Sequence, residues 1–482
     1  MKLKMSPNNL VLAAMIVAVS MTFIDQTIIA LAVPEIQKNL GLSASGVQWV
    51  INGYVLALAS AFMVAGKLSD AFGHRKMVIF GSVAFAAASA ACGFTPVGPN
   101  SEAWIITFRV IQGVGAAFLF SAALALVVAT FPLDKRGFKL AIFFAITGAM
   151  TGLGPLLGGY LTEWTWRAVF WVNIPVAVVA LILISISHPV DTVKRQRIDW
   201  RGAILVAAGM ALSVFGFQRS STWGWTDERT IACIVAGLAL LVIFALVELR
   251  TTNPLANLRI FKVRAFFVEN LVLFFASMVF VSLFFFASLY AQISLGNSTS
   301  EAGLYIMTFF IGFAPAAMRG GKILDKVGAK GVVVVGAAVS TVGFYLWSQQ
   351  LTDLSYSSQF WYIIIAGAGM GLIIGPASTD AINRAQKESY GEVTGIAQTV
   401  RYYGSSVGLA VLGTILIDNT TAGSNYYADA KTSAGRLEFA DALQKVFVAM
   451  AVIMAITFVI SIIGLRAGRQ TDIPGAQPVP TS

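Results

Sequence analysis

The chain has 482 residues, of which 57% are hydrophobic and 12% are charged, and its formal net charge is +10 at pH 7. In soluble globular domains about a quarter of all residues are charged, so this composition excludes an ordinary soluble protein. The apolar residues instead fall into runs of about 18–25 residues, which are long enough to cross a bilayer as helices.

Fourteen such membrane-spanning runs are predicted. They lie near residues 10–32, 47–66, 77–94, 103–125, 136–160, 168–186, 200–219, 228–249, 265–290, 301–319, 331–349, 358–378, 393–418 and 442–466. The connection 419–441 is polar and is expected to be a loop or a short surface helix. No stretch that is left over could form a soluble domain.

The basic residues indicate the orientation of the chain. Most of the 33 Lys and Arg fall on connections that share one side of the membrane with the two termini. Cytoplasmic connections carry such an excess, so we expect both termini in the cytoplasm, with the chain in the cytoplasmic (inner) membrane. The positive charge is then explained by topology and contact with anionic lipids, and no nucleic-acid partner is expected.

Two charged residues lie deep within predicted spans. Asp25 is about nine residues from the outer end of the first run and Arg109 about seven from that of the fourth, so their depths agree within about 3 Å at 1.5 Å per residue. A buried arginine is costly unless it is paired. We expect the two side chains to face each other in the central cavity, with Gln112 one turn away, either as a structural ion pair or as part of a proton-coupling site.

A charged turn follows the second run and recurs after the tenth. The shared positions are Gly66, Lys67, Asp70, Gly73 and Arg75 in the first copy, and Gly321, Lys322, Asp325, Gly328 and Lys330 in the second. One match would be weak, but two in register within one membrane chain indicate two related halves.

The repeat divides the chain once the seventh and eighth runs are set aside. Residues 1–190 and 265–470 then form two six-helix bundles. Residues 191–264 hold an inserted pair of helices that carries few polar residues within the membrane, bridges the halves and faces lipid. The tail 471–482 contains three prolines and is expected to be disordered.

The fifth run is rich in glycine and contains a proline. Its marked positions are Gly148, Gly152, Gly154, Pro155, Gly158 and Gly159. Proline removes a backbone donor and kinks the helix, and glycines let a neighbouring helix approach closely. The segment 166–175 that follows is rich in aromatic residues, which we expect to anchor the chain at the membrane interface.

The second half contains a phenylalanine-rich ninth run and two further buried charges. The aromatic stripe is expected mainly to pack, with a substrate-facing surface as the alternative. Glu269 and Arg401 lie at similar depths and are candidates for a second ion pair, either structural or coupling. Away from the ends of the spans, and apart from Asp380 at a boundary, spans ten to fourteen carry no acidic residue.

These motifs resemble those of the major facilitator superfamily, specifically its fourteen-span drug:proton antiporters, over about residues 10–466. The resemblance implies that Arg109 takes part in proton transfer and that the Asp70 turn latches the two halves on the cytoplasmic side. It also implies that the glycine-rich fifth span is the motif associated with antiport. The segment beginning at Asp25 resembles the first-span motif of the same family.

The sequence therefore predicts a proton-coupled multidrug efflux antiporter that exports amphiphilic small molecules by alternating access. The alternatives are a dedicated exporter of an endogenous metabolite or lipid, and a membrane sensor that does not transport. No phosphate-binding loop, metal-ligand cluster or catalytic triad is present in the sequence, so we expect no enzyme activity and no cofactor or metal, with a proton gradient as the energy source. A monomer is expected to suffice, and the need for a periplasmic adaptor stays open.

Overall fold

The computed structural model describes residues 6–131, 133–187, 199–252, 254–383, 390–420 and 432–468. Within these ranges every regular element is helical, and fourteen helices are long and apolar enough to cross a membrane. The number of spans is thus confirmed for the part of the chain that the structure describes. The tail 471–482 and the connection 191–198 lie outside the described residues.

The helices before and within the insertion are longer than the predicted apolar runs. Their bounds are α1 Pro7–Leu40, α2 Ala44–Phe72, α3 His74–Gly93, α4 Ser101–Thr130, α5 Leu133–Trp164, α6 Ala168–Trp171, α7 Asn173–Ser187, α8 Trp200–Trp223 and α9 Glu228–Arg250. The predicted sixth span is divided at Val172 into α6 and α7.

The helices after the insertion follow the same pattern. They are α10 Arg264–Leu289, α11 Thr299–Val327, α12 Ala329–Gln349, α13 Tyr356–Asn383, α14 Tyr390–Asp418 and α16 Ser433–Gly464, with short helices at Leu258–Lys262, Tyr290–Ser294 and Leu351–Asp353. Helix α16 begins within the stretch predicted as a polar connection, because the Thr432 side chain accepts the backbone N–H of Gly435 and caps the helix there.

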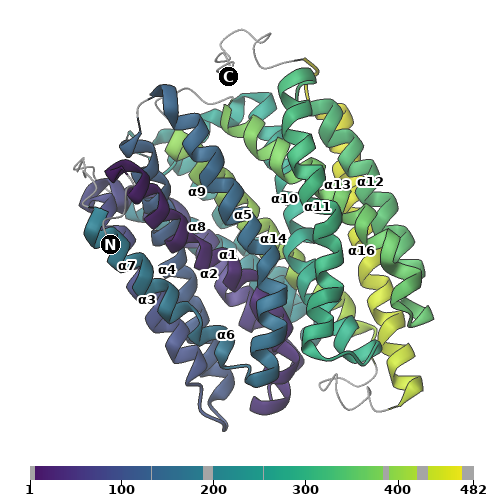
Figure 1. The fold of residues 1–482 in the computed structure, drawn as a ribbon. Helices are drawn as coiled ribbons and strands as arrows, with labels where there is room; N and C mark the ends of the chain where they lie inside the picture. Colours follow the sequence, from purple (N-terminus) through teal and green to yellow (C-terminus); the bar gives the residue numbers. More distant parts are fainter. Residues whose placement is uncertain are drawn as a thin grey trace.

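Helix packing repeats between the two parts of the chain. In the first part, α1 packs on α5 and α7, and α4 packs on α2 and α3; in the second, α10 packs on α14 and α16, and α13 packs on α11 and α12. In Figure 1, the purple-to-blue helices α1–α7 lie mainly on the left and the green-to-yellow α10–α13 and α16 on the right. We call these two parts the first and the second half.

The repeated turns have matching backbones. Gly73 ends α2 with φ +102°, and Gly328 ends α11 with φ +84°. Each donates its N–H to the carbonyl four residues earlier, Ser69 and Leu324 respectively. A side chain at positive φ is strained, so glycine is needed at both positions. We call the side of the molecule that carries these turns, the start of α1 and the end of α16 the termini side.

The halves meet along two seams, α5 with α11 and α2 with α14. On the side opposite the termini the helices touch: a Cβ on Gly303 would lie 2.5 Å from the Pro155 carbonyl oxygen, and one on Gly413 would lie 2.5 Å from the Gln48 side chain. Contact continues to Gly152 beside Phe310 in the first seam and to Phe62 stacked on Tyr402 in the second.

Beyond those points, the seams separate toward the termini side. Gly148 lies one turn from Gly152 and Gly66 one turn from Phe62, so each continues its seam-facing side of the helix. A Cβ on Gly148, Gly66, Gly321 or Gly395 would meet no atom within 4 Å. Among the residues that the structure describes, the two halves are therefore closed against each other on the opposite side and apart on the termini side.

The inserted helices lie against the α2–α14 seam. Helix α9 is largely exposed and apolar. Helix α8 differs from the prediction because its buried polar side chains bond to both halves. Gln218 accepts from Asn52 of α2 at 3.1 Å, and Ser213 lies 2.8 Å from the Tyr403 hydroxyl of α14.

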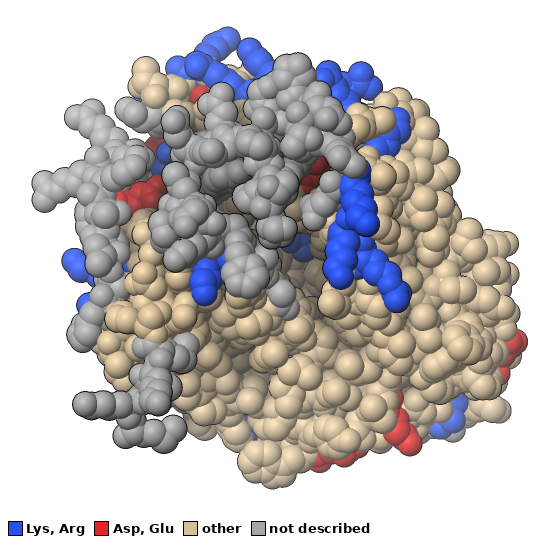
Figure 2. All heavy atoms as spheres, turned by 45° about the horizontal axis from the view of Figure 1, so that its top comes forward, with Lys and Arg blue, Asp and Glu red and all other residues tan. Residues whose placement is uncertain are grey.

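The charged residues cluster at the membrane surfaces. In Figure 2, where the top of Figure 1 comes forward, Lys and Arg gather at the upper rim and near the middle of the face, while the lower flanks are broadly free of charge. An apolar band between charged ends is the surface that a bilayer requires.

The close approach at Gly303 yields a first prediction. A methyl group there meets main chain of α5, so Gly303→Ala should push the α5–α11 seam apart and make a cysteine introduced at Thr299 react faster with a water-soluble maleimide. The test uses a background in which Cys92 and Cys233 are replaced by serine. Gly331→Ala, whose Cβ would meet nothing within 4 Å, is the matched control. Equal labelling rates in the two variants would contradict the close contact.

Candidate functional site

The carboxylate of Asp25 lies buried in the first half, where three side chains from two helices donate to it. Arg109 of α4 donates through Nη1 to Oδ2 at 2.6 Å. Gln112 of α4 and Asn173 of α7 donate to Oδ1 at 2.9 Å and 3.2 Å. Asp25 is 1% exposed. Hydrogen bonds of this kind stabilise the ionised form of the carboxylate against the cost of burial.

Arg109 is enclosed on several sides. Its Nε donates to the Val50 carbonyl of α2 at 2.8 Å, its Nη1 also donates to Gln112 Oε1 at 2.7 Å, and its guanidinium carbon lies 4.4 Å from the centre of the Tyr54 ring. Its Nη2 has no hydrogen-bond partner among the described residues. A guanidinium at membrane depth needs such surroundings, because water is absent there.

The predicted contact between Asp25 and Arg109 is therefore confirmed, but its predicted place is corrected. Both side chains are almost fully buried inside the first half and neither lines an open cavity. Depth estimated from the sequence gives the height of a residue along its helix but not the direction in which it points.

Sequence analysis missed Asn173 and Tyr54 in this cluster. Asn173 lies in a segment that we assigned to interfacial anchoring, yet its side chain is buried, with 1% exposed. Phe170 and Trp166 of the same segment are buried as well. The available signal was a polar amide just after the aromatic residues and two positions before a proline. Tyr54 carries no motif that would mark it.

The glycine-rich helix α5 packs closely against two other helices through glycines on two of its faces. Gly154 and Gly158 lie against α1, where a Cβ would clash with Thr27 and with the Ile28 carbonyl; Gly152 and Gly159 face α11. Pro155 has no N–H for the Thr151 carbonyl four residues earlier. Thr27 of α1 donates its hydroxyl to that carbonyl at 3.0 Å, so α1 satisfies the acceptor that the proline leaves without its helical partner.

In the repeated turn of the first half, Asp70 contacts a residue of its own turn. Asp70 Oδ1 lies 3.7 Å from His74 Nε2, and its side chain is 44% exposed. His74 Nδ1 lies 2.7 Å from the Ser69 hydroxyl. Arg75 is partly buried. The side chain of Asp325, its counterpart in the second half, lies outside the described residues.

Glu269 and Arg401 do not form an ion pair in the part of the chain that the structure describes. Glu269 is buried on α10, whereas Arg401 of α14 donates to Gln398 on its own helix at 2.8 Å. Close contacts at Gly404 and Gly408 set these parallel helices side by side. The two residues thus share a depth, but Arg401 points along α14 instead of crossing to α10.

The phenylalanines of the second half pack around the point where the α5–α11 seam opens. Phe284 stacks on Phe310 with ring centres 5.6 Å apart, and Phe280 lies 5.4 Å from Phe313. Phe310 in turn lies 3.3 Å from the Cβ position of Gly152. The expected packing role is thus observed, at the end of the closed contact.

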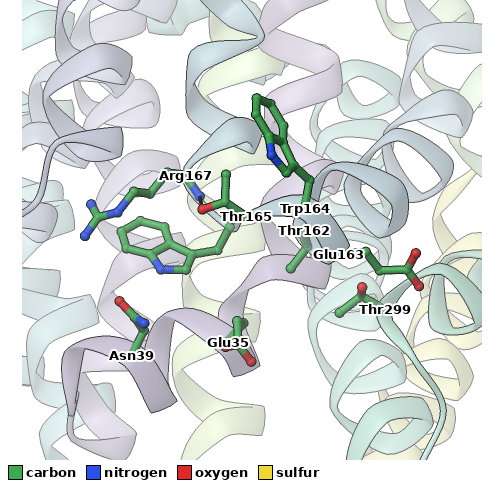
Figure 3. A pocket seen from close by; sticks show the side chains of 9 residues that line it. Glu35, Asn39, Thr162, Glu163, Trp164, Thr165, Arg167 and Thr299 are labelled. Atoms are coloured by element: carbon green, nitrogen blue, oxygen red, sulfur yellow. Dashed lines mark hydrogen bonds between the residues drawn. The ribbon is translucent and has the colours of Figure 1, made fainter.

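The closed side carries polar contacts between the halves and a small cavity. Glu163 of α5 accepts from the Ser300 hydroxyl, and Thr299 donates to the Gly159 carbonyl at 3.1 Å. Figure 3 shows Glu163 and Thr299 together at one side of a cavity of about 410 Å³, with Arg167 extending away from them. Arg167 donates to the Gly93 and Thr95 carbonyls, and partial burial lowers the pKa of its guanidinium.

Comparison with known families and proteins gives a consistent result. A family model described as Major Facilitator Superfamily matches residues 15–409. The "Tetracenomycin C resistance and export protein" of Streptomyces glaucescens is 32% identical over 84% of this chain and 75% of that protein. "Multidrug resistance protein 3" of Bacillus subtilis (strain 168) is 26% identical over 90% of this chain and 84% of the relative.

Solved structures show the same fold at low sequence identity. A POT family peptide transporter in an autoinhibited form matches with a TM-score of 0.66 at 15% identity, over 95% of this chain and 97% of that one. A bacterial homologue of the human lysosomal transporter Spinster matches with a TM-score of 0.65 at 17% identity, over 96% and 97% of the two chains. These two likenesses concern the fold alone.

The burial of the Asp25–Arg109 pair yields a second prediction. Arg109→Met leaves a buried carboxylate without its cationic partner, which should lower the free energy of unfolding by about 3–5 kcal/mol. Adding Asp25→Asn should recover part of this loss. Unfolding in detergent measures the double-mutant cycle. Arg167→Met, which removes a partly exposed guanidinium bound to two carbonyls and the Trp166 ring, should cost less. Strict additivity in the cycle would show that the pair contributes no coupling energy.

Proposed function

The chain belongs to the major facilitator superfamily and is an exporter of that superfamily, not an enzyme, and we propose that it is a proton-coupled antiporter that expels amphiphilic small molecules by alternating access. The observation that carries the proposal is the Asp25 carboxylate, buried beside Arg109 and held by N–H donors. A buried carboxylate inside a membrane transporter is a natural site for a transported proton.

The moving units are the two six-helix bundles, residues 1–190 and 265–470, with residues 191–264 as the inserted pair. Their closed contact at Gly303 and Gly413 and their separation at Gly66 and Gly321 support an arrangement open on one side of the membrane only. With both termini in the cytoplasm, as the distribution of Lys and Arg favours, this opening faces the cytoplasm. An exporter loads its substrate from that side.

Proton movement would couple to this motion through Arg109. In the cytoplasm-facing arrangement Asp25 is ionised and Arg109 is neutralised by it. Protonation of Asp25 from the outer side removes that partner, and the guanidinium must then be satisfied by Val50, Gln112 and Tyr54. Glu269 and Arg401 are the reserve candidates for the same role in the second half, although they do not pair with each other here.

The substrate is a small amphiphilic molecule, and two classes are open. The names of the relatives support multidrug export as the first candidate. The relative named for resistance to and export of tetracenomycin C supports a dedicated exporter of one compound as the second. A substrate screen in cells that lack other pumps would distinguish them. Energised flux from proteoliposomes would exclude a sensor that does not transport.

Replacing Asp25 tests the coupling. Asp25→Asn removes the titrating group while keeping the shape of the side chain, so uphill export should be lost and substrate binding retained. The measurement is proton release alongside substrate flux in proteoliposomes with an imposed pH gradient, and Asp353→Asn, an exposed carboxylate on the opposite side, is the control. Proton release at the wild-type ratio in the Asn variant would move the proton site elsewhere, with Glu269 the next candidate.

The Asp70 turn is proposed as a latch that closes the cytoplasmic side when the halves approach each other there. In the arrangement described, Asp70 is half-exposed and contacts His74 of its own turn, as a disengaged latch would. Asp70→Asn should leave the protein folded but reduce export several-fold, because the outward-open state loses a contact. Cysteine accessibility on both sides should shift toward the cytoplasm-open pattern. Full export with unchanged accessibility would reduce the turn to an ordinary connection.

A further inference from the structure

We propose that Asn173 is a positioning residue that stabilises the ionised form of Asp25 and thereby sets the pH range over which this carboxylate takes up and releases its proton. The inference deepens the proposed proton coupling and rests on it for its functional meaning. Its structural part concerns the protonation of Asp25 alone and can be measured without transport.

The orientation of the Asn173 amide follows from its neighbours. The Asn173 Nδ2 atom lies 3.2 Å from Asp25 Oδ1 and 3.0 Å from Ser89 Oγ. The Ser89 hydroxyl donates its only hydrogen to the Phe170 carbonyl at 2.8 Å. Ser89 Oγ can therefore only accept from Asn173, so the NH₂ group, and not the carbonyl oxygen, faces the carboxylate. Ser89 and Phe170 thus fix Asn173 as a donor to Asp25.

This donor distinguishes the two protonation states of the carboxylate. An N–H aimed at an oxygen stabilises the negative charge, and the benefit is larger where water is excluded. Asn173 is 1% exposed and sits on α7, outside the helix that carries Arg109. Gln112, by contrast, bonds to both Asp25 and Arg109, so a change at Gln112 would disturb the cation as well. Asn173 bonds to the carboxylate and has no bond to the Arg109 guanidinium among the described contacts.

Other groups around Asp25 provide the electrostatic background. Arg109 faces it from α4, and Tyr54 of α2 and Cys92 of α3 interact with its charge. Near Asp25, the described contacts of α1 with its other neighbours are made by uncharged groups, such as the Thr151 carbonyl of α5 and the Gln292 amide that follows α10. Lys139 of α5 also contacts α1, but it donates to Asn9 Oδ1 at 2.9 Å, at the far start of the helix. None of these groups bonds to Asn173, so its replacement leaves this background in place.

The test is a titration of the Asp25 carboxyl band by infrared difference spectroscopy on the full chain in lipid nanodiscs. Asp25→Asn identifies the band. Asn173→Leu keeps the branched shape of the side chain but removes the donor, and should move the midpoint of the titration upward by about one pH unit, the equivalent of one hydrogen bond to a charged group. Asn173→Asp places a second carboxyl group at the same position and should move the midpoint further upward. Asn270→Ala, which removes a buried amide of α10 that donates to Phe266, should not move it.

The outcomes separate this inference from the proposed function. A midpoint equal to that of the wild type in either folded Asn173 variant would overturn the inference, and the Asp variant keeps the test available if the Leu variant does not fold. If the band shifts and the pH dependence of export shifts with it, both proposals are supported. If the band shifts while the pH dependence of export stays unchanged, Asn173 still controls Asp25, but the coupling proton binds elsewhere.

Discussion

A guanidinium buried at the depth of a membrane determines the arrangement of the first half. Arg109 cannot be hydrated there, so neighbouring helices must supply its partners. Asp25 of α1, the Val50 carbonyl and the Tyr54 ring of α2, and Gln112 of its own helix do so. Asn173 and Ser89 then bring α7 and α3 to the same point. The charge thus connects five helices through one cluster.

The seams between the halves depend on a different device, which is the absence of side chains. Gly159 and Gly303 let the main chains of α5 and α11 touch, and Gly413 makes room for the Gln48 side chain between α14 and α2. Dispersion contacts and small residues drive helix association in lipid, where no hydrophobic force acts between helices. Contacts of this kind can be broken and remade without leaving a buried charge unpaired. The charged cluster lies within one half, so motion between the halves does not need to disrupt it.

The inserted helices connect the two halves at one of the seams between them. Helix α8 bonds through Gln218 to Asn52 of α2 and through Ser213 to Tyr403 of α14. Helix α9 covers α8, with Gly237 set against the Ser213 main chain. The pair is therefore more than a lipid-facing appendage, because it holds the α2–α14 seam together by hydrogen bonds on the closed side.

The sequence by itself determined the fold class, the number of spans and the repeat. Hydrophobic length is set by the thickness of the bilayer, and the glycines at positions 73 and 328 are required locally by positive φ, so both features can be predicted without tertiary structure. The contact between Asp25 and Arg109 was also accessible, because a buried arginine demands a partner at its own depth.

Only the tertiary structure decided which way the side chains point. The direction of a side chain depends on how its helix is rotated about its axis, and that rotation is set by packing against several neighbouring helices at once. The depth of a residue along one helix does not determine this direction. For this reason Glu269 and Arg401 share a level without pairing with each other in the described part of the chain. Asp25 lies inside the first half instead of in a central cavity, and Asn173 points from a segment assigned to interfacial anchoring toward a buried carboxylate. The hydrogen bonds of α8 to α2 and α14 could not be predicted either, because they depend on where the two halves meet.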